Sequence, residues 1–140
     1  MVKQLSVFIE NSKGRLAHLT RVLGDAGVDL HSLSIADTTN FGILRAIVDD
    51  NEKALKVLHE HNYTVNTTEL LAVAVKDIPG GLAQALEVLD NAGVNIEYLY
   101  SFVRKPRDSA LILFKVDDAP KAVATLEKHK MRMLTQEELI

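Results

Sequence analysis

Residues 77–83, with the sequence DIPGGLA, stand between an apolar run and an amphipathic segment. The run before them, LAVAV at residues 71–75, is typical of a buried strand. Apolar residues recur at helical spacing from Leu82 onward, and Pro79 suits the first turn of a helix because its missing N–H has no partner there. The two glycines allow close approach of a backbone or a ligand. The stretch is therefore predicted to be a strand-to-helix corner whose N–H groups and positive dipole end suit a carboxylate.

The same corner occurs earlier in the chain, as part of an internal repeat. Matching positions are Gly14 with Gly80, residues 26–28 (AGV) with 92–94, and residues 48–50 (VDD) with 116–118. The second copy carries a short insertion between the last two of these matches. The chain is thus interpreted as a tandem duplication, with one unit at residues 1–70 and the other at residues 71–140.

Each copy is expected to form a strand, a helix, two strands, a second helix and a last strand. In the first copy the expected strands are residues 4–9, 28–36, 43–48 and 64–68, and the expected helices are residues 14–26 and a segment capped by Asp50 or Asn51. This βαββαβ order predicts the ferredoxin-like arrangement of the α+β class, an antiparallel sheet with helices on one face. The second copy repeats the pattern, with Asp118 as a cap. Since no linker separates the copies, the two units are expected to pack side by side, and the last strand of one could continue into the first strand of the next.

Composition limits the classes of function. The 140 residues include 47% hydrophobic side chains and carry a formal charge of −3, which favours a packed core and argues against a nucleic-acid surface. The absence of cysteine excludes disulfides, thiolate metal sites and cysteine nucleophiles. The first residues lead straight into a strand, without a signal-peptide core or a long apolar span, so a cytoplasmic protein without membrane association is expected.

The corner and the helix after it resemble the ACT domain. The pattern Asp-x-Pro-Gly-x-Leu-Ala at residues 77–83, followed by a helix that ends in LDNAGVNI at residues 89–96, is similar to the signature of that family. The first copy departs from it, since a lysine stands in the place of Pro79 and Asn11 in the place of Asp77. The resemblance covers the whole chain as two tandem units, similar to the stand-alone tandem ACT proteins of bacteria. It implies a regulatory module that binds an amino acid and controls a metabolic enzyme.

Ligands of this family lie at the interface between paired units, near the first strand–helix loop of one unit and the second strand of its neighbour. The ligand-binding residues that the resemblance implies are Asn11, Gly14, Arg15, Leu16, Ile35, Ala36, Asp77, Ile78, Gly80, Gly81, Leu82, Ser101 and Phe102. Asn11 and Asp77 can accept hydrogen bonds from an ammonium group, or each can cap its own helix. The loop at residues 77–82 is expected to be the stronger anchor, because Pro79 pins its helix and its glycines leave the approach open.

The resulting hypothesis is a non-enzymatic sensor of a small amino acid, without a cofactor or a metal. The sequence offers no thiol, no cluster with metal-ligand spacing and no nucleophile beside a base. An alternative is a module that binds no metabolite and only docks on a metabolic enzyme. An RNA-binding sheet would need stacked aromatic residues where the first strands offer only Phe8. An acylphosphatase-like enzyme would need an anion-binding loop with an arginine and a catalytic asparagine, and the loop from Asn11 to Arg15 resembles such a loop only loosely.

A homodimer is expected to form through the open faces of the sheets. Alternation along the strands places apolar side chains on the face away from the helices, at Phe8, Ile43, Ile47, Ala72, Ala74, Leu111 and Leu113. A large apolar patch on a monomer marks an interface, so Leu113→Lys should weaken assembly. Residues 37–40 are expected to form a turn, and Arg104, Lys105 and Arg107 a solvated hairpin tip.

Overall fold

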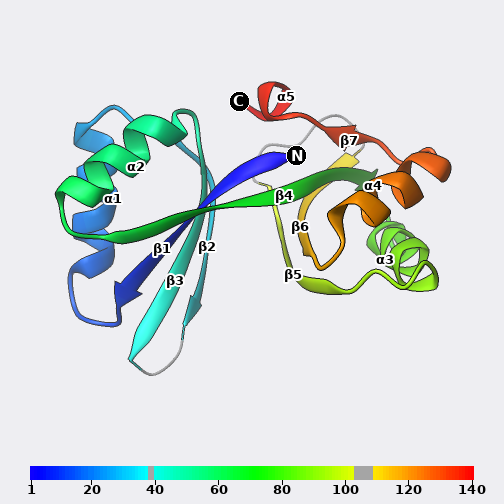
Figure 1. Ribbon diagram of the computed structural model, residues 1–140, viewed down its shortest axis with the longest axis horizontal. Helices are drawn as coiled ribbons and strands as arrows, with labels where there is room; N and C mark the ends of the chain where they lie inside the picture. The colour runs from blue at the N-terminus through cyan, green and yellow to red at the C-terminus, as the bar shows by residue number, and fades with distance from the viewer. Residues whose placement is uncertain (38–39, 103–108) are drawn as a thin grey trace. The chain divides into compact units, whose positions relative to one another are not determined.

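A computed structural model describes residues 1–37, 40–102 and 109–140 (Figure 1). The chain divides into two compact units, which we call the N-terminal unit (residues 3–68) and the C-terminal unit (residues 69–139). Residues 1–2 group with the C-terminal unit and residue 140 with the N-terminal one. The middle of the predicted turn at residues 37–40 and the whole basic hairpin tip, with Arg104, Lys105 and Arg107, lie outside the described residues.

The N-terminal unit has the predicted βαββαβ order. Its elements are β1 (Val2–Glu10), α1 (Arg15–Asp25), β2 (Leu30–Asp37), β3 (Phe41–Val48), α2 (Asn51–Glu60) and the first part of β4 (Thr64–Lys76). The strand order in its sheet is β4-β1-β3-β2, and β3 pairs antiparallel with both β1 and β2. Figure 1 shows both helices on the same side of this sheet. The ferredoxin-like α+β prediction is confirmed.

The core of the N-terminal unit lies between the sheet and the two helices. Leu44, Ala46 and Val48 of β3 belong to it, as their alternation in the sequence predicted. Leu19 and Leu58 meet them from the helices, and neither is accessible to solvent. Asp50 is the N-cap of α2, and its carboxylate accepts a hydrogen bond of 3.0 Å from the N–H of Lys53. The predicted cap is therefore confirmed.

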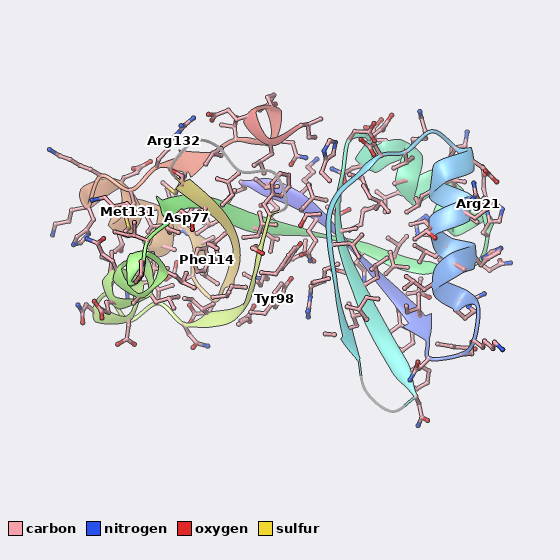
Figure 2. The ribbon with its side chains drawn as sticks, turned by 180° about the vertical axis from the view of Figure 1, so that it is seen from behind. Arg21, Asp77, Tyr98, Phe114, Met131 and Arg132 are labelled. Atoms are coloured by element: carbon pink, nitrogen blue, oxygen red, sulfur yellow. The ribbon has the colours of Figure 1, made fainter. Side chains whose placement is uncertain are left out.

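The C-terminal unit repeats this plan and adds to it. Its elements are the rest of β4, α3 (Gly81–Asn91), β5 (Ile96–Ser101), β6 (Ser109–Val116), α4 (Ala119–Lys128), β7 (Met133–Leu134) and α5 (Gln136–Leu139). Strand β4 pairs with β6 and β7, and β6 pairs with β5, all antiparallel. Phe114 of β6 is fully buried in the core with Leu89 and Leu126 (Figure 2). Asp118 caps α4 through the N–H of Lys121, as predicted.

Strand β4 runs without interruption from one unit into the other. The expected strands at residues 64–68 and 71–75 are one strand of 13 residues. The sequence TVNTTELLAVAVK is rich in β-branched residues and contains no glycine or proline, so nothing in it breaks the extended backbone. The possibility of a continuous strand, raised by the missing linker, is therefore confirmed.

The short helix α5 has a capping box that the sequence reading overlooked. The N–H of Thr135 donates to Oε1 of Glu138 at 3.1 Å, and the N–H of Glu138 donates to Oγ1 of Thr135 at 3.3 Å. Arg132 Nη2 also donates to Oε2 of Glu138 at 2.9 Å. The hydrogen bond from the Thr135 backbone, and then the one from Arg132, hold the pKa of Glu138 below its ordinary value.

These contacts predict how α5 responds to acid. A carboxylate whose pKa is lowered by folding stabilises the folded helix above its ordinary pKa and loses this effect as the pH falls through the lowered value. Amide exchange in residues 136–139 should therefore accelerate only at a pH below the usual range of a glutamate, measured relative to the intrinsic rate. Glu138→Gln is the control, and its exchange should show no such step. A step near the ordinary pKa of a glutamate would contradict the prediction.

The open faces of the sheets differ from the sequence prediction. Phe8 and Ile43, which oppose each other across β1 and β3, are 46% and 37% exposed, and Phe41 stacks on Phe8 with 5.0 Å between ring centroids. Of the other five predicted residues, Ala74 is partly buried and four are buried within the single chain: Ile47, Ala72, Leu111 and Leu113. The prediction that Leu113 is available to a second copy was wrong, and Leu113→Lys would measure folding instead.

None of the helices that the described residues form is long and apolar enough to span a membrane.

Candidate functional site

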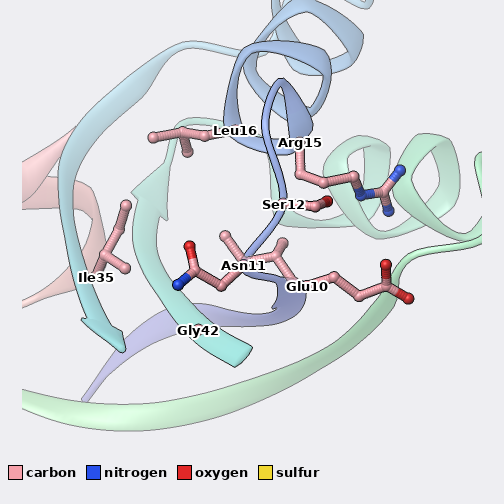
Figure 3. Close-up of a pocket in the computed structure, with 8 residues that line it drawn as sticks. Glu10, Asn11, Ser12, Arg15, Leu16, Ile35 and Gly42 are labelled. Carbon is pink, nitrogen blue, oxygen red and sulfur yellow. The ribbon is translucent and has the colours of Figure 1, made fainter. Parts of the chain in front are cut away.

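A pocket of about 220 Å³ lies at the end of the sheet in the N-terminal unit, where β1 turns into α1 (Figure 3). We call this turn the first loop, and the equivalent turn between β4 and α3 the second loop. The residues that line the pocket come from the first loop, from α1 and from the ends of three strands: Ile9, Glu10, Asn11, Ser12, Arg15, Leu16, Ile35 and Gly42. All of them belong to the N-terminal unit.

The backbone holds the first loop in place. The N–H of Asn11 donates to the carbonyl of Asn40 at 2.9 Å, and the N–H of Arg15 donates to the carbonyl of Ser12 at 3.3 Å. Gly14 is the N-cap of α1 and has a φ of +88°, a backbone conformation that residues other than glycine rarely adopt. Since glycine has no capping side chain, the N–H groups of Leu16 and Ala17 in the first helical turn have no side-chain cap, while that of Arg15 donates to Ser12.

One wall of the pocket is apolar. Leu16 and Ile35 are 39% and 42% exposed, and Ile9 lies opposite Gly42 across the paired strands β1 and β3. A Cβ added to Gly42 would lie 3.5 Å from Cγ1 of Ile9 and 3.6 Å from Cγ2 of Ile35. Gly42 does not have a positive φ, so its backbone does not require a glycine. Its missing side chain therefore serves to leave space between the two isoleucines.

The polar side chains divide between the two sides of the loop. In Figure 3 the amide of Asn11 points toward Ile35, whereas the ends of Glu10 and Arg15 point away from Ile35. The guanidinium carbon of Arg15 lies 4.6 Å from the centre of the Tyr63 ring, in cation–π geometry. The charge of Arg15 is therefore directed toward the space beside Tyr63, and the amide of Asn11 is the polar side chain that faces the apolar wall.

The second loop repeats the backbone of the first but gathers fewer of the predicted residues. Gly80 caps α3 with a φ of +85°, and the N–H of Gly81 donates to the carbonyl of Ile78 at 3.0 Å. Ile78 is 61% exposed. A pocket of about 310 Å³ in the C-terminal unit is lined by Gly81 but not by Asp77, Ile78 or Gly80.

The remaining predicted residues are placed as follows. Leu82 packs partly buried against the core of the C-terminal unit, and Phe102 is buried with its N–H donating to the carbonyl of Leu111. Ala36 and Ser101 are exposed on their strands. The structure thus brings together Asn11, Arg15, Leu16 and Ile35, and it adds four lining residues that were not predicted: Ile9, Glu10, Ser12 and Gly42. Among these, Gly42 carried a usable signal, because a glycine inside a strand often marks close approach of another group.

Comparisons with known proteins agree with this architecture. A model of the family described as an ACT domain pair matches residues 1–140. The chain belongs to the ACT domain pair family. ACT domains are regulatory modules.

Solved structures resemble this ACT domain pair along nearly its whole length. Protein BT0572 from Bacteroides thetaiotaomicron is 37% identical, with a TM-score of 0.92 over 99% of this chain and 94% of that one. The ligand-free regulatory subunit of aspartate kinase from Thermus thermophilus is 14% identical, with a TM-score of 0.64 over 90% and 91% of the two chains. At that identity the second likeness shows a shared fold. A comparison with curated proteins gave no match.

Proposed function

We propose that this ACT domain pair senses an amino acid with an aliphatic side chain and regulates an enzyme of amino-acid metabolism. The observation that carries the proposal is the pocket at the first loop, where an apolar wall, an amide and a helix N-terminus surround one space. These are the three kinds of group that a zwitterion with an apolar side chain needs.

Each part of such a ligand has a counterpart in the pocket. The carboxylate would meet the N–H groups of Leu16 and Ala17 in the first turn of α1, where the helix dipole favours an anion. The ammonium group would donate to the amide oxygen of Asn11. The aliphatic side chain would lie between Leu16 and Ile35, above the space that Gly42 leaves. A ligand of about ten heavy atoms held in this way should bind in the micromolar to millimolar range.

The regulatory role rests on the family. The regulatory subunit of aspartate kinase from Thermus thermophilus has the same fold, and it belongs by name to an enzyme of amino-acid metabolism. Ligand binding to the first loop would change the surface that this chain presents to a partner enzyme. A module that docks on an enzyme without any metabolite remains the competing function.

The two loops can be tested against each other by calorimetry with leucine, valine, glutamate and lysine. We expect leucine or valine to bind and the charged amino acids to bind at least about tenfold more weakly, because the wall opposite Asn11 is apolar. Leu16→Asp should remove binding, while Ile78→Asp, which alters an exposed apolar side chain of the second loop, should leave it unchanged. If Ile78→Asp lost binding and Leu16→Asp did not, the second loop would be the stronger anchor, as the sequence predicted. No binding of any amino acid at millimolar concentration would favour the module without a ligand.

A homodimer through the open face of the N-terminal unit is a further part of the proposal. Phe8, Phe41 and Ile43 form an exposed apolar patch on the face away from the helices. Such a patch on a monomer marks an interaction surface. Phe8→Asp combined with Ile43→Asp should shift the protein from dimer to monomer in sedimentation velocity at micromolar concentration. Ile78→Asp is the control and should remain dimeric, and a monomeric wild-type protein would contradict the prediction.

A further inference from the structure

The C-terminal unit has a pocket of different chemistry. Its volume is about 310 Å³, and its polar and charged lining residues are Lys76, Gln84, Ser109, His129, Lys130 and Arg132. None of the residues that line it is acidic. The segment with Met131 and Arg132 joins α4 to β7 on one side of the pocket (Figure 2).

The duplication shows how this space differs between the two copies. In the repeat, Gly81 corresponds to Arg15 and Met131 to Tyr63. In the N-terminal unit the guanidinium of Arg15 covers the ring of Tyr63 at 4.6 Å, and Nδ1 of His18 lies 2.6 Å from the Tyr63 hydroxyl. These side chains fill the space between the loop and the end of α2. In the C-terminal unit Met131 stands in place of Tyr63, Gly81 has no side chain and its backbone lies against the carbonyl of Lys76, and a pocket lies beside these residues.

The residues that surround this space have also changed their charge. The positions of Glu10, Asn62 and Thr64 in the first copy are held by Lys76, Lys130 and Arg132 in the second. His61 corresponds to His129, so the histidine is common to both copies. The change replaces an acid and two neutral side chains by three cations. Arg132 also bonds Glu138 of α5, which the first copy lacks, but the fold does not require the two lysines, because the first copy forms the corresponding strand and helices without them.

The backbone conformation of Lys130 also indicates that the cation is kept for a function. Lys130 has a φ of +55°, and its counterpart Asn62 has a φ of +64°. Asparagine adopts this left-handed conformation readily, whereas a lysine in it carries strain. The chain therefore keeps a cation at the pocket where an asparagine would suit the backbone better. Strain of this kind concentrates at functional sites.

From these observations we infer that the pocket binds a compact anion with at least two negative charges, such as a phosphoryl group or a small dicarboxylate. Lys76 and Lys130 make no ion pair with any residue that the structure describes. Arg132 Nη2 pairs with Oε2 of Glu138 at 2.9 Å, and the other N–H groups of the guanidinium can donate to the ligand. Gln84 and Ser109 offer neutral hydrogen-bond donors on the lining. This site is separate from the first loop and does not depend on the amino-acid proposal.

Calorimetry on the full chain tests the inference with inorganic phosphate and with succinate, at constant ionic strength. Both anions are expected to bind with dissociation constants in the millimolar range or below. The anion with the smaller dissociation constant shows whether the natural ligand carries a phosphoryl group or two carboxylates. Lys76→Glu with Lys130→Asn restores the residues of the first copy and should weaken binding by at least about tenfold. Lys128→Asn removes one positive charge, as Lys130→Asn alone does, two residues from Lys130 and outside the lining, and should change the affinity less than about twofold.

Two results would overturn the inference. One is that the wild-type chain binds neither phosphate nor succinate at about 10 mM, well above the dissociation constant expected for the site. The other is that Lys128→Asn weakens binding as much as the double variant does, because the anion would then respond to general surface charge. Since the first copy folds with glutamate and asparagine at these positions, the double variant should keep the wild-type melting temperature, which separates loss of binding from loss of folding.

Discussion

Gly42→Val should abolish binding of an aliphatic amino acid at the first loop, with a loss of affinity of about a hundredfold or more. The branched side chain would occupy the space between Ile9 and Ile35 that the ligand needs. Isothermal titration with leucine measures the effect directly. This is the largest change in binding that we expect from a single substitution, because it fills the pocket and does not merely remove one hydrogen bond.

The folded state should survive the smaller substitution Gly42→Ala. A Cβ at position 42 makes ordinary van der Waals contacts of 3.5 to 3.8 Å, and the φ of Gly42 is not positive. Gly42→Ala should therefore melt close to the wild-type protein and bind with an intermediate affinity. Gly24→Ala is the matched control, since its Cβ would meet open space on the exposed side of α1. Undiminished binding by a folded Gly42→Val protein would show that the ligand lies elsewhere.

Gly81→Ala should destabilise the C-terminal unit by about 3 kcal/mol, although it adds only one methyl group. A Cβ at this position would overlap the carbonyl oxygen of Lys76, which is backbone and cannot rotate away. Either β4 or the start of α3 must move, and both contribute to the core around Phe114 and Leu89. Chemical denaturation followed by circular dichroism measures the loss.

The equivalent position in the first copy provides the comparison. Arg15 carries a full side chain there, so Arg15→Ala removes only the contact with Tyr63 and should cost about 1 kcal/mol or less. Gly24→Ala should stabilise the protein by a similar small amount, because alanine favours a helix more than glycine does. A Gly81→Ala protein as stable as either control would show that the second loop has more freedom than its geometry indicates.

Much of the fold followed from local pattern and from the repeat. Alternation placed Leu44 and Phe114 on the helix side of their strands, and Asp50 and Asp118 were correct as caps because capping depends on a few adjacent residues. Burial of Leu113 was beyond such reasoning. Alternation assigns a side chain to a face, but whether that face is covered depends on the rest of the chain.

The site was predictable in part. The family pattern named Asn11, Leu16 and Ile35, which line one pocket. It could not tell that the second loop leaves Ile78 in solvent, because both loops have the same left-handed glycine before the helix. The difference lies in side-chain volume across the fold. Gly42 opens one space, and the other lies where Met131 and Gly81 replace the stacked Tyr63 and Arg15.

The uninterrupted β4 has a consequence for how such a protein can evolve. A gene for two modules joined by a loop can lose one module, exchange it or insert a new one at the joint. Here the joint lies inside a strand of 13 residues, so a genetic crossover at that point would cut a strand that both units share. A crossover there would have to rejoin the strand in register, whereas a substitution within either copy leaves the strand intact. The apolar pocket of one and the cationic pocket of the other are the outcome that this constraint favours.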